Sequence, residues 1–203
     1  MVIKRGSRTS KDPFFRLSAE YVPGRALNPR DGADLSALAE LFAAFYSRSR
    51  QVDLAETEFP YQLWADLRFL ARVGVIDAGL HAALSELAQH RQPARGWVGF
   101  DYNDAVSKTF IIRDDDGRAC AVDVESLQPD MLVGWGLVKA KVRWLGASTE
   151  TFLEQVVDAG SPDFREYFDY LELSFLARWT KFGFMERKWK YVQPELLVGL
   201  MES

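Results

Sequence analysis

Three consecutive aspartates followed by a glycine, at residues 114–117, are the stretch whose residue types most resemble a metal-binding loop. An EF-hand calcium loop has oxygen ligands at alternate positions before its glycine and a glutamate six residues after it. Here the first ligand position is Ile112 and the last is Asp123, whose side chain is shorter than that of glutamate. Because the flanking residues also read as strands, the run predicts a turn and no metal site.

A β-hairpin accounts for the same stretch. A three-residue loop at 115–117, with Gly117 in the left-handed conformation, would join two short strands. The register that this loop imposes places two facing pairs on one apolar face: Phe110 with Val122, and Ile112 with Cys120. Cys120 is the single cysteine of the chain, so we expect a buried core thiol, no internal disulfide and no cysteine-based zinc site.

The best-defined charged surface in the sequence is a row of basic residues in the segment 137–144. Lys139, Lys141 and Arg143 alternate with apolar residues, so a strand would present all three charges on one face. That face could meet the carboxylates or phosphates of a partner. The alternative is that these charges protect an exposed sheet edge from aggregation. We predict a partner-binding site made of these three residues, with Trp97 and Trp135 as aromatic anchors.

Other motifs in the sequence give weaker evidence of a functional site. The acidic residues of the long C-terminal helix lack the Glu-x-x-His pattern of di-metal bundles, and we expect them on its solvent-exposed face. His81 and His90 have no second set of ligands. Gly134-Trp135-Gly136 lacks the spacing and the following Lys-Ser/Thr of a phosphate loop. The helix pair around Gly74 resembles a helix-turn-helix in outline, but its second helix has few side chains that read bases.

Hydrophobic periodicity and turn residues predict the elements that hold these residues. Helices are expected over 33–50, 60–73, 77–90, 148–158 and 162–182, with a short element near 194–201. Strands are expected over 96–102, 108–113, 118–124 and 137–144. The order predicts an α+β fold: N-terminal helices, a central antiparallel β-meander of three to four strands, and C-terminal helices that include one long amphipathic helix.

Charge and composition divide the chain into two parts. Residues 1–30 carry a net charge of +5 within an overall charge of −4, so the remainder carries −9. We predict a basic, partly ordered arm over 1–30 and one α+β domain over 31–203, helical at 31–92, a β-meander at 95–145 and helical at 148–201. No apolar run approaches the roughly 20 residues that span a bilayer, and a cytoplasmic protein without a membrane partner is expected.

The scarcity of catalytic motifs sets the functional expectation. The chain has two histidines and one cysteine, so few side chains are suited to general-base or nucleophilic catalysis. We expect a non-catalytic protein-binding factor, of the bacterial inhibitor, immunity or phage accessory kind, without cofactor or metal and with another protein, or a second copy of the chain, as partner. One alternative is a nucleic-acid-associated protein that uses the basic arm and the segment 137–144. A second alternative is a carboxylate-based enzyme.

Overall fold

The computed structural model describes residues 22–201 and has the expected α+β fold. The helices are α1 (Gly32–Tyr46), α2 (Phe59–Arg72), α3 (Ala78–Arg91), α4 (Trp135–Ala140), α5 (Thr149–Asp158), α6 (Phe168–Met185) and α7 (Pro194–Gly199). The strands are β1 (Gly24–Ala26), β2 (Arg50–Asp53), β3 (Arg95–Tyr102), β4 (Phe110–Arg113), β5 (Ala119–Ala121) and β6 (Leu127–Leu132). Most of the predicted basic arm, residues 1–21, lies outside the described residues.

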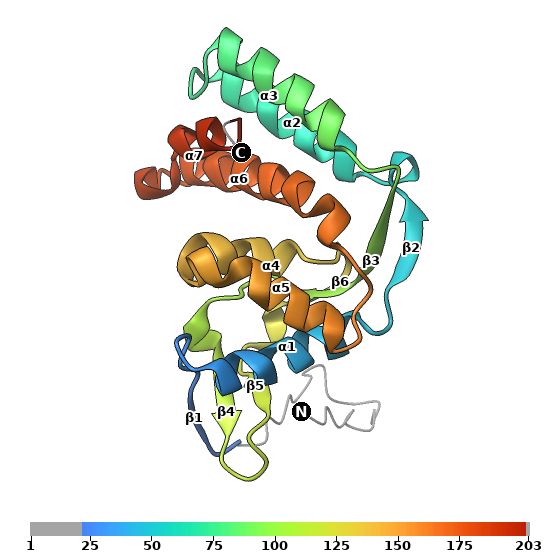
Figure 1. The fold of residues 1–203 in the computed structure, drawn as a ribbon. Helices are drawn as coiled ribbons and strands as arrows, with labels where there is room; N and C mark the ends of the chain where they lie inside the picture. The colour runs from blue at the N-terminus through green and yellow to red at the C-terminus, as the bar shows by residue number, and fades with distance from the viewer. Residues whose placement is uncertain (1–21, 202–203) are drawn as a thin grey trace, which may run out of the picture.

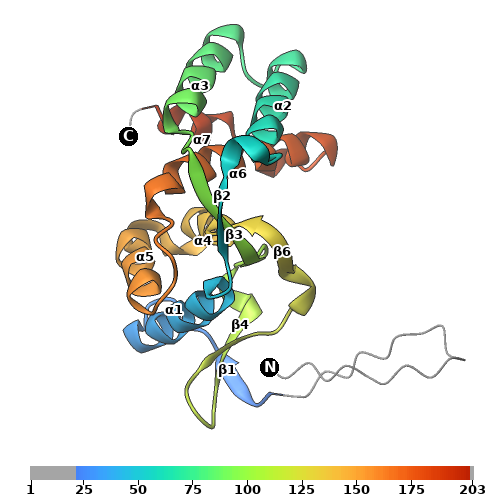
Figure 2. The ribbon, with the colours of Figure 1, turned by 90° about the vertical axis from the view of Figure 1, so that its right-hand side faces the viewer.

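The strands form two antiparallel sheets of three strands, ordered β1-β4-β5 and β2-β3-β6. In Figure 1, α2, α3, α6 and α7 lie at one end of the molecule, and α1 lies at the other end with the β1-β4-β5 sheet. Figure 2 shows β2 and β3 running lengthwise between the two ends. Since β3 ends at Tyr102 and β4 begins at Phe110, the loop between them leads from one sheet into the other.

Aromatic side chains join helix α1 to both sheets and to α5. Phe42 and Tyr46 lie one turn apart on the buried face of α1, as helical spacing requires. The Phe42 ring contacts Phe110 of β4 at 5.7 Å between ring centroids and Phe152 of α5 at 6.3 Å. The Tyr102 ring lies 5.1 Å from Phe110. This cluster fixes the end of β3 against the base of the β4-β5 hairpin.

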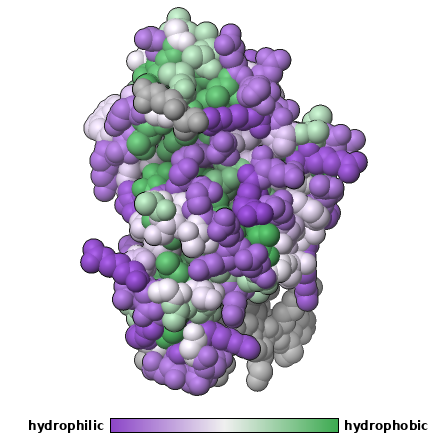
Figure 3. Space-filling view, viewed as in Figure 1, coloured by the Kyte–Doolittle hydropathy of each residue, from purple (hydrophilic) through white to green (hydrophobic). Residues whose placement is uncertain are grey.

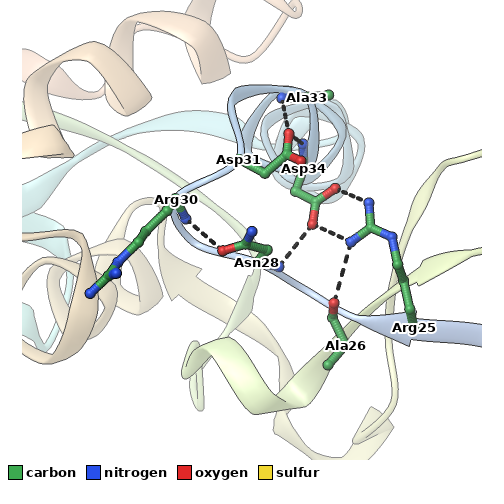
Figure 4. Close-up of polar contacts among 7 residues, drawn as sticks. All are labelled: Arg25, Ala26, Asn28, Arg30, Asp31, Ala33 and Asp34. Atoms are coloured by element: carbon green, nitrogen blue, oxygen red, sulfur yellow. Dashed lines mark hydrogen bonds and ion pairs between the residues drawn. The ribbon is translucent and has the colours of Figure 1, made fainter.

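An ion pair between the half-exposed Arg25 and the buried Asp34 ties β1 to the start of α1 (Figure 4). Asp31 caps the helix by accepting a hydrogen bond from the Ala33 amide at 2.9 Å. Asp34 is buried and accepts two hydrogen bonds from the Arg25 guanidinium, at 2.6 and 2.5 Å, and one from the Asn28 amide at 2.8 Å. The Arg25 hydrogen bond holds the pKa of Asp34 below its usual value. The last residues of the predicted arm are therefore part of the fold.

The strand predicted over 137–144 is wrong, because this segment is helical. Residues 135–140 form α4, and Lys141–Leu145 continue it as a turn of π-helix. The alternation of apolar and basic residues suggested a strand, but Leu137, Val138 and Ala140 are all buried as part of one helix. Local periodicity was overridden by the packing of this segment against α6.

The predicted β4-β5 hairpin is present, but its register differs by one residue. Phe110 pairs with Ala121, and Ile112 pairs with Ala119, so a four-residue loop spans 114–117. Gly117 has φ +70°, the left-handed conformation expected of it. The Arg113 side chain bonds to Asp115 at 3.0 and 2.5 Å, which stabilises the longer loop. The predicted pair Phe110–Val122 is therefore absent, and Val122 is exposed.

Apolar side chains also reach the surface. Figure 3 shows that on this face they gather around the C-terminal end of the chain, over α7 and the neighbouring part of α3. Between residues 22 and 201, no helix is both long enough and apolar enough to cross a bilayer.

Candidate functional site

A buried carboxylate organises the end of β3. The Asp101 side chain is fully buried and accepts hydrogen bonds from the Tyr46 hydroxyl at 3.2 Å and from three backbone amides. These amides belong to Tyr102 at 2.6 Å, Gly134 at 2.8 Å and Gly136 at 3.2 Å. Burial raises the pKa of Asp101 to about 7, and the hydrogen bonds oppose this rise. Asp101 thus joins β3 to the start of α4.

The Gly134-Trp135-Gly136 sequence is explained by this contact. Gly134 has φ +98°, which glycine adopts without strain. A Cβ on Gly136 would lie 2.1 Å from the Tyr102 carbonyl oxygen, so only glycine allows α4 to approach β3 this closely. The two glycines therefore bind an internal carboxylate with their amides.

Two further carboxylates meet around the loop that follows β3. Asp104 lies in this loop, and Asp123 follows β5, where its side chain accepts a hydrogen bond from the Ser126 hydroxyl at 2.9 Å. The Tyr102 hydroxyl is buried near both carboxylates. Burial raises the pKa of Tyr102, hydrogen bonding to Thr109 and to the Asp123 backbone opposes this rise, and the charges of Asp123 and Asp104 add to it. These three side chains therefore form one electrostatic unit.

Thr109 and Lys139 complete this unit. The Thr109 side chain is buried and donates to the backbone oxygens of Asp104 and Val106, at 3.0 and 2.7 Å, which fixes the loop. Lys139 reaches across from α4 and pairs with the Asp104 carboxylate. Its ammonium also lies 5.1 Å from the centre of the Trp179 ring. We call Tyr102, Asp104, Thr109, Asp123 and Lys139 the loop site.

The predicted partner-binding residues do not form one surface. Lys139 pairs with Asp104, and Lys141 donates to Glu172 of α6 at 2.8 Å, so both cations already have internal partners. Arg143 is exposed on the π-helical turn. Trp135 is buried and Trp97 is half-buried, which leaves neither as an exposed anchor. The three basic residues would share one face only on a strand, and the segment 137–144 is helical.

Metal-ligating side chains do not gather in the described part of the chain. Within residues 22–201, no three His, Cys, Asp or Glu side chains come close enough to hold a metal ion by themselves. The D-D-D-G run closes its hairpin, with Asp115 and Asp116 engaged by Arg113.

Comparison with solved structures shows that the fold of this chain is similar to that of a kinase. The chain is similar to an ethanolamine kinase from Plasmodium vivax, with a TM-score of 0.60 and 10% sequence identity over 95% of this chain. It spans 66% of the length of that kinase, which is just under two thirds. In all, 22 solved chains match. No protein-family model and no curated protein sequence matches the chain.

This similarity overturns the functional expectation drawn from the sequence. The expected non-catalytic protein-binding factor of the inhibitor, immunity or phage accessory kind is wrong, because the fold is similar to that of an ethanolamine kinase. The alternative of a nucleic-acid-associated protein loses one of its two supports, since the segment 137–144 is helical. Its other support, the basic arm, lies mostly outside the described residues.

Sequence reasoning missed Asp101, Asp104 and Tyr102 as candidates. A signal was present: an aspartate just after a strand, a hairpin beginning six residues later, and a second aspartate just after that hairpin. Asp123 was examined only as the last position of a calcium loop. Strand-loop-hairpin order, not metal-ligand spacing, brings Asp104 and Asp123 together.

Proposed function

We propose that this chain carries a phosphoryl-transfer site, with Asp104 as the base and Asp123 as the carboxylate that faces the nucleotide phosphates. The observation that supports it most is the kinase-like fold over 95% of the chain, with both carboxylates beside the loop after β3. In protein kinases, the catalytic-loop aspartate precedes a metal-binding asparagine by five residues, and a second metal-binding aspartate follows. Here Asp104 precedes Thr109 by five residues, and Asp123 follows the hairpin.

Asp104 has the properties required of a base for a hydroxyl substrate. Its side chain is 39% exposed, so a substrate can reach it, and Lys139 holds it in one orientation. In the reaction, the substrate hydroxyl gives its proton to Asp104 while its oxygen forms a bond to the terminal phosphorus of the nucleotide. The bond between that phosphorus and the bridging oxygen breaks, and the nucleoside diphosphate leaves with the electron pair.

Kinase-like transfer uses Mg²⁺, and the donors of the loop site fit this ion. Mg²⁺ prefers oxygen ligands and is usually held by one or two carboxylates together with waters and substrate phosphates. Asp123 and the Thr109 hydroxyl would supply the protein oxygens, and the buried Tyr102 hydroxyl is a further polar group beside them. When bound, the ion would neutralise negative charge on the phosphates.

Two departures from the kinase pattern favour a second candidate, a kinase-like protein that binds its ligand without transferring phosphate. Thr109 stands where kinases have asparagine, and its hydroxyl already donates to backbone oxygens. Residues 22–201 also contain no G-x-G-x-x-G loop to cover the nucleotide phosphates. A cytoplasmic location, where nucleoside triphosphates are available, goes with either candidate.

The test is release of ADP from Mg·ATP in the presence of a panel of small hydroxyl compounds. We expect turnover by the native chain, and a loss of roughly 10²- to 10⁴-fold for Asp104→Asn, the range for removal of a general base. Asp123→Asn should lose turnover as well. Asp158→Asn, an exposed aspartate at the end of α5, is the matched control and should keep full activity.

This assay and a binding titration with Mg·ATP together separate the two candidates. Saturable binding of Mg·ATP without ADP release by the native chain would support ligand binding alone. Turnover that survives in Asp104→Asn would remove Asp104 from the proposed role.

A further inference from the structure

Helix α6 ends on a surface that is both apolar and basic. Every residue from 185 to 190 is exposed, and Met185 and Trp189 are 61% and 62% exposed. Phe182 lies three residues before Met185, beside it on the helix, and is also exposed. Exposed apolar side chains that adjoin one another, unlike scattered ones, mark a contact with a partner. We define the terminal patch by six residues: Phe182, Met185, Arg187, Lys188, Trp189 and Lys190.

The cations of the terminal patch have few partners within the protein. Arg187 and Lys190 form no ion pair with any residue between 22 and 201. Lys188 lies 4.0 Å from the Glu186 carboxylate, and both side chains are about half exposed. An exposed pair at this distance adds little stability. Three cations are therefore available to an anionic partner.

A shallow groove extends the basic surface along α6. It has a volume of about 220 Å³ and runs beside Phe182 and Met185. Arg178 and Lys181 also line it, and these two cations share the buried Asp66, at 3.0 and 2.6 Å. Because one carboxylate faces two cations, the groove keeps a positive charge next to the exposed apolar side chains, although the whole chain has a net charge of −4.

Arg187 occupies a backbone conformation that favours glycine. Its φ is +53°, at the position where helices commonly end on a left-handed glycine. The Arg187 amide donates to the Phe184 carbonyl at 3.2 Å, and the Lys188 amide donates to the Gly183 carbonyl at 2.8 Å, which closes the turn. The turn itself would be more stable with glycine. A contact made by the guanidinium would account for an arginine here.

The aromatic rings around the terminal patch are already packed on their faces. Phe182 stacks on Trp179 at 6.0 Å, and the Lys188 ammonium lies 4.7 Å from the centre of the Phe182 ring. Tyr191 lies 4.8 Å from Trp179, and the Lys190 ammonium lies 4.9 Å from the centre of the Tyr191 ring. Single-stranded nucleic acids bind by stacking bases on free ring faces. This packing therefore disfavours a nucleic acid as the partner.

We propose that the terminal patch contacts the surface of a membrane that contains anionic lipids. Its cations would face the lipid headgroups, and Trp189 and Met185 would enter the interfacial region, where tryptophan is enriched. The expectation of no membrane partner rested on the lack of a spanning segment, which a surface contact does not require. The proposal rests on the terminal patch and does not depend on phosphoryl transfer at the loop site.

The experiment is co-sedimentation of the full chain with lipid vesicles. One set contains phosphatidylcholine alone, and the other contains phosphatidylcholine and phosphatidylserine at about 7:3, so that only the second is anionic. We expect binding to the anionic vesicles that weakens as salt is raised, and little binding to the neutral ones. Equal binding to both sets, or binding to neither, would overturn the proposal.

A triple variant tests the charges of the terminal patch. In Arg187→Gln/Lys188→Gln/Lys190→Gln, binding to the anionic vesicles should fall about a hundredfold, since each cation near an anionic surface contributes roughly fivefold. Unchanged binding by this variant would overturn the proposal.

The matched control removes three exposed cations at the opposite end of the molecule. Arg30→Gln/Arg48→Gln/Arg118→Gln has the same net charge as the patch variant, but these residues lie near α1 and the β4-β5 hairpin (Figure 1). It should bind the anionic vesicles as the native chain does. A loss equal to that of the patch variant would mean that overall charge, not the terminal patch, attracts the membrane.

Trp189→Ser tests the apolar part of the contact. Because this side chain is largely exposed, its removal should leave the thermal unfolding midpoint near that of the native chain. Binding to the anionic vesicles should fall about tenfold, the effect of one apolar side chain that leaves water. Undiminished binding would remove Trp189 from the contact. A single-stranded oligonucleotide is the competing probe, and salt-sensitive binding of it without vesicle binding would overturn the proposal.

Discussion

Asp101 shows how one residue can hold the candidate site in place without entering its chemistry. Its carboxylate accepts hydrogen bonds from three backbone amides and one hydroxyl, which belong to β3, α1 and the start of α4. Each partner is a donor, so the ionised form is well satisfied, yet burial still raises the pKa to about 7. The stability of the fold should therefore depend on the charge of this group.

The pH dependence has a definite sign. The pKa of Asp101 is about 7 in the folded protein, and the ordinary pKa of an aspartate is 3.8. The native state therefore binds the proton more tightly than the unfolded chain. Its contribution to stability is largest below about pH 4 and is lost as the pH rises to about 7. Asp101→Asn removes this contribution and also places an amide donor against backbone donors, at a cost of about 1–3 kcal/mol.

Urea unfolding of the native chain and of Asp101→Asn, at a series of pH values between about 5 and 8, measures this effect. The stability difference between the two should shrink as the pH rises. A difference that grows with pH would show that Asp101 is preferentially ionised in the folded protein.

At the scale of elements, the contact between α4 and β3 positions both Lys139 and the loop that follows Tyr102. The contact depends on Gly136, where a Cβ would lie 2.1 Å from a backbone oxygen and 2.7 Å from the Asp101 carboxylate. Backbone atoms cannot move aside as the end of a side chain can. The helix would have to shift away from the strand.

Gly136→Ala should therefore destabilise the fold by about 1–3 kcal/mol or more, the range for overpacking. Gly199→Ala is the matched control, since a Cβ there meets no atom within 4 Å. It should be neutral or slightly stabilising. Equal thermal unfolding midpoints for the two variants would mean that α4 can be accommodated farther from β3.

The same elements show what the sequence could predict. Helices with a clear apolar stripe were found close to their observed bounds, as for α2, expected at 60–73 and observed at Phe59–Arg72. The short strands β1, β2 and β6 were missed, because they are polar or carry Pro129, and only pairing with other strands defines them. The helix expected to begin at residue 162 begins at Phe168.

The candidate site was harder to predict for a related reason. Motif searches test the spacing of like residues, whereas the loop site joins one aspartate after β3 to another after β5. The pairing of Lys139 with Asp104 arises only when α4 packs beside β3. This contact leaves no periodic pattern in the sequence.

At the scale of the whole molecule, a series of aromatic contacts connects α6 with the loop site. Arg178 lies over Trp135 at 5.8 Å, Trp135 contacts Phe175 at 5.7 Å, and Phe175 stacks on Trp179 at 5.6 Å. Trp179 lies beneath the Lys139 ammonium, which pairs with Asp104. The loop site therefore rests on one continuous set of packed side chains from α4 and α6.

The central claim is that the kinase-like fold carries a working nucleotide site around Asp104 and Asp123. The most direct measurement is calorimetric titration with a non-hydrolysable ATP analogue, with and without Mg²⁺. The account predicts saturable binding that requires Mg²⁺, is lost in Asp123→Asn and is retained in Asp104→Asn. Absence of Mg²⁺-dependent binding, or equal binding by Asp123→Asn, would contradict it.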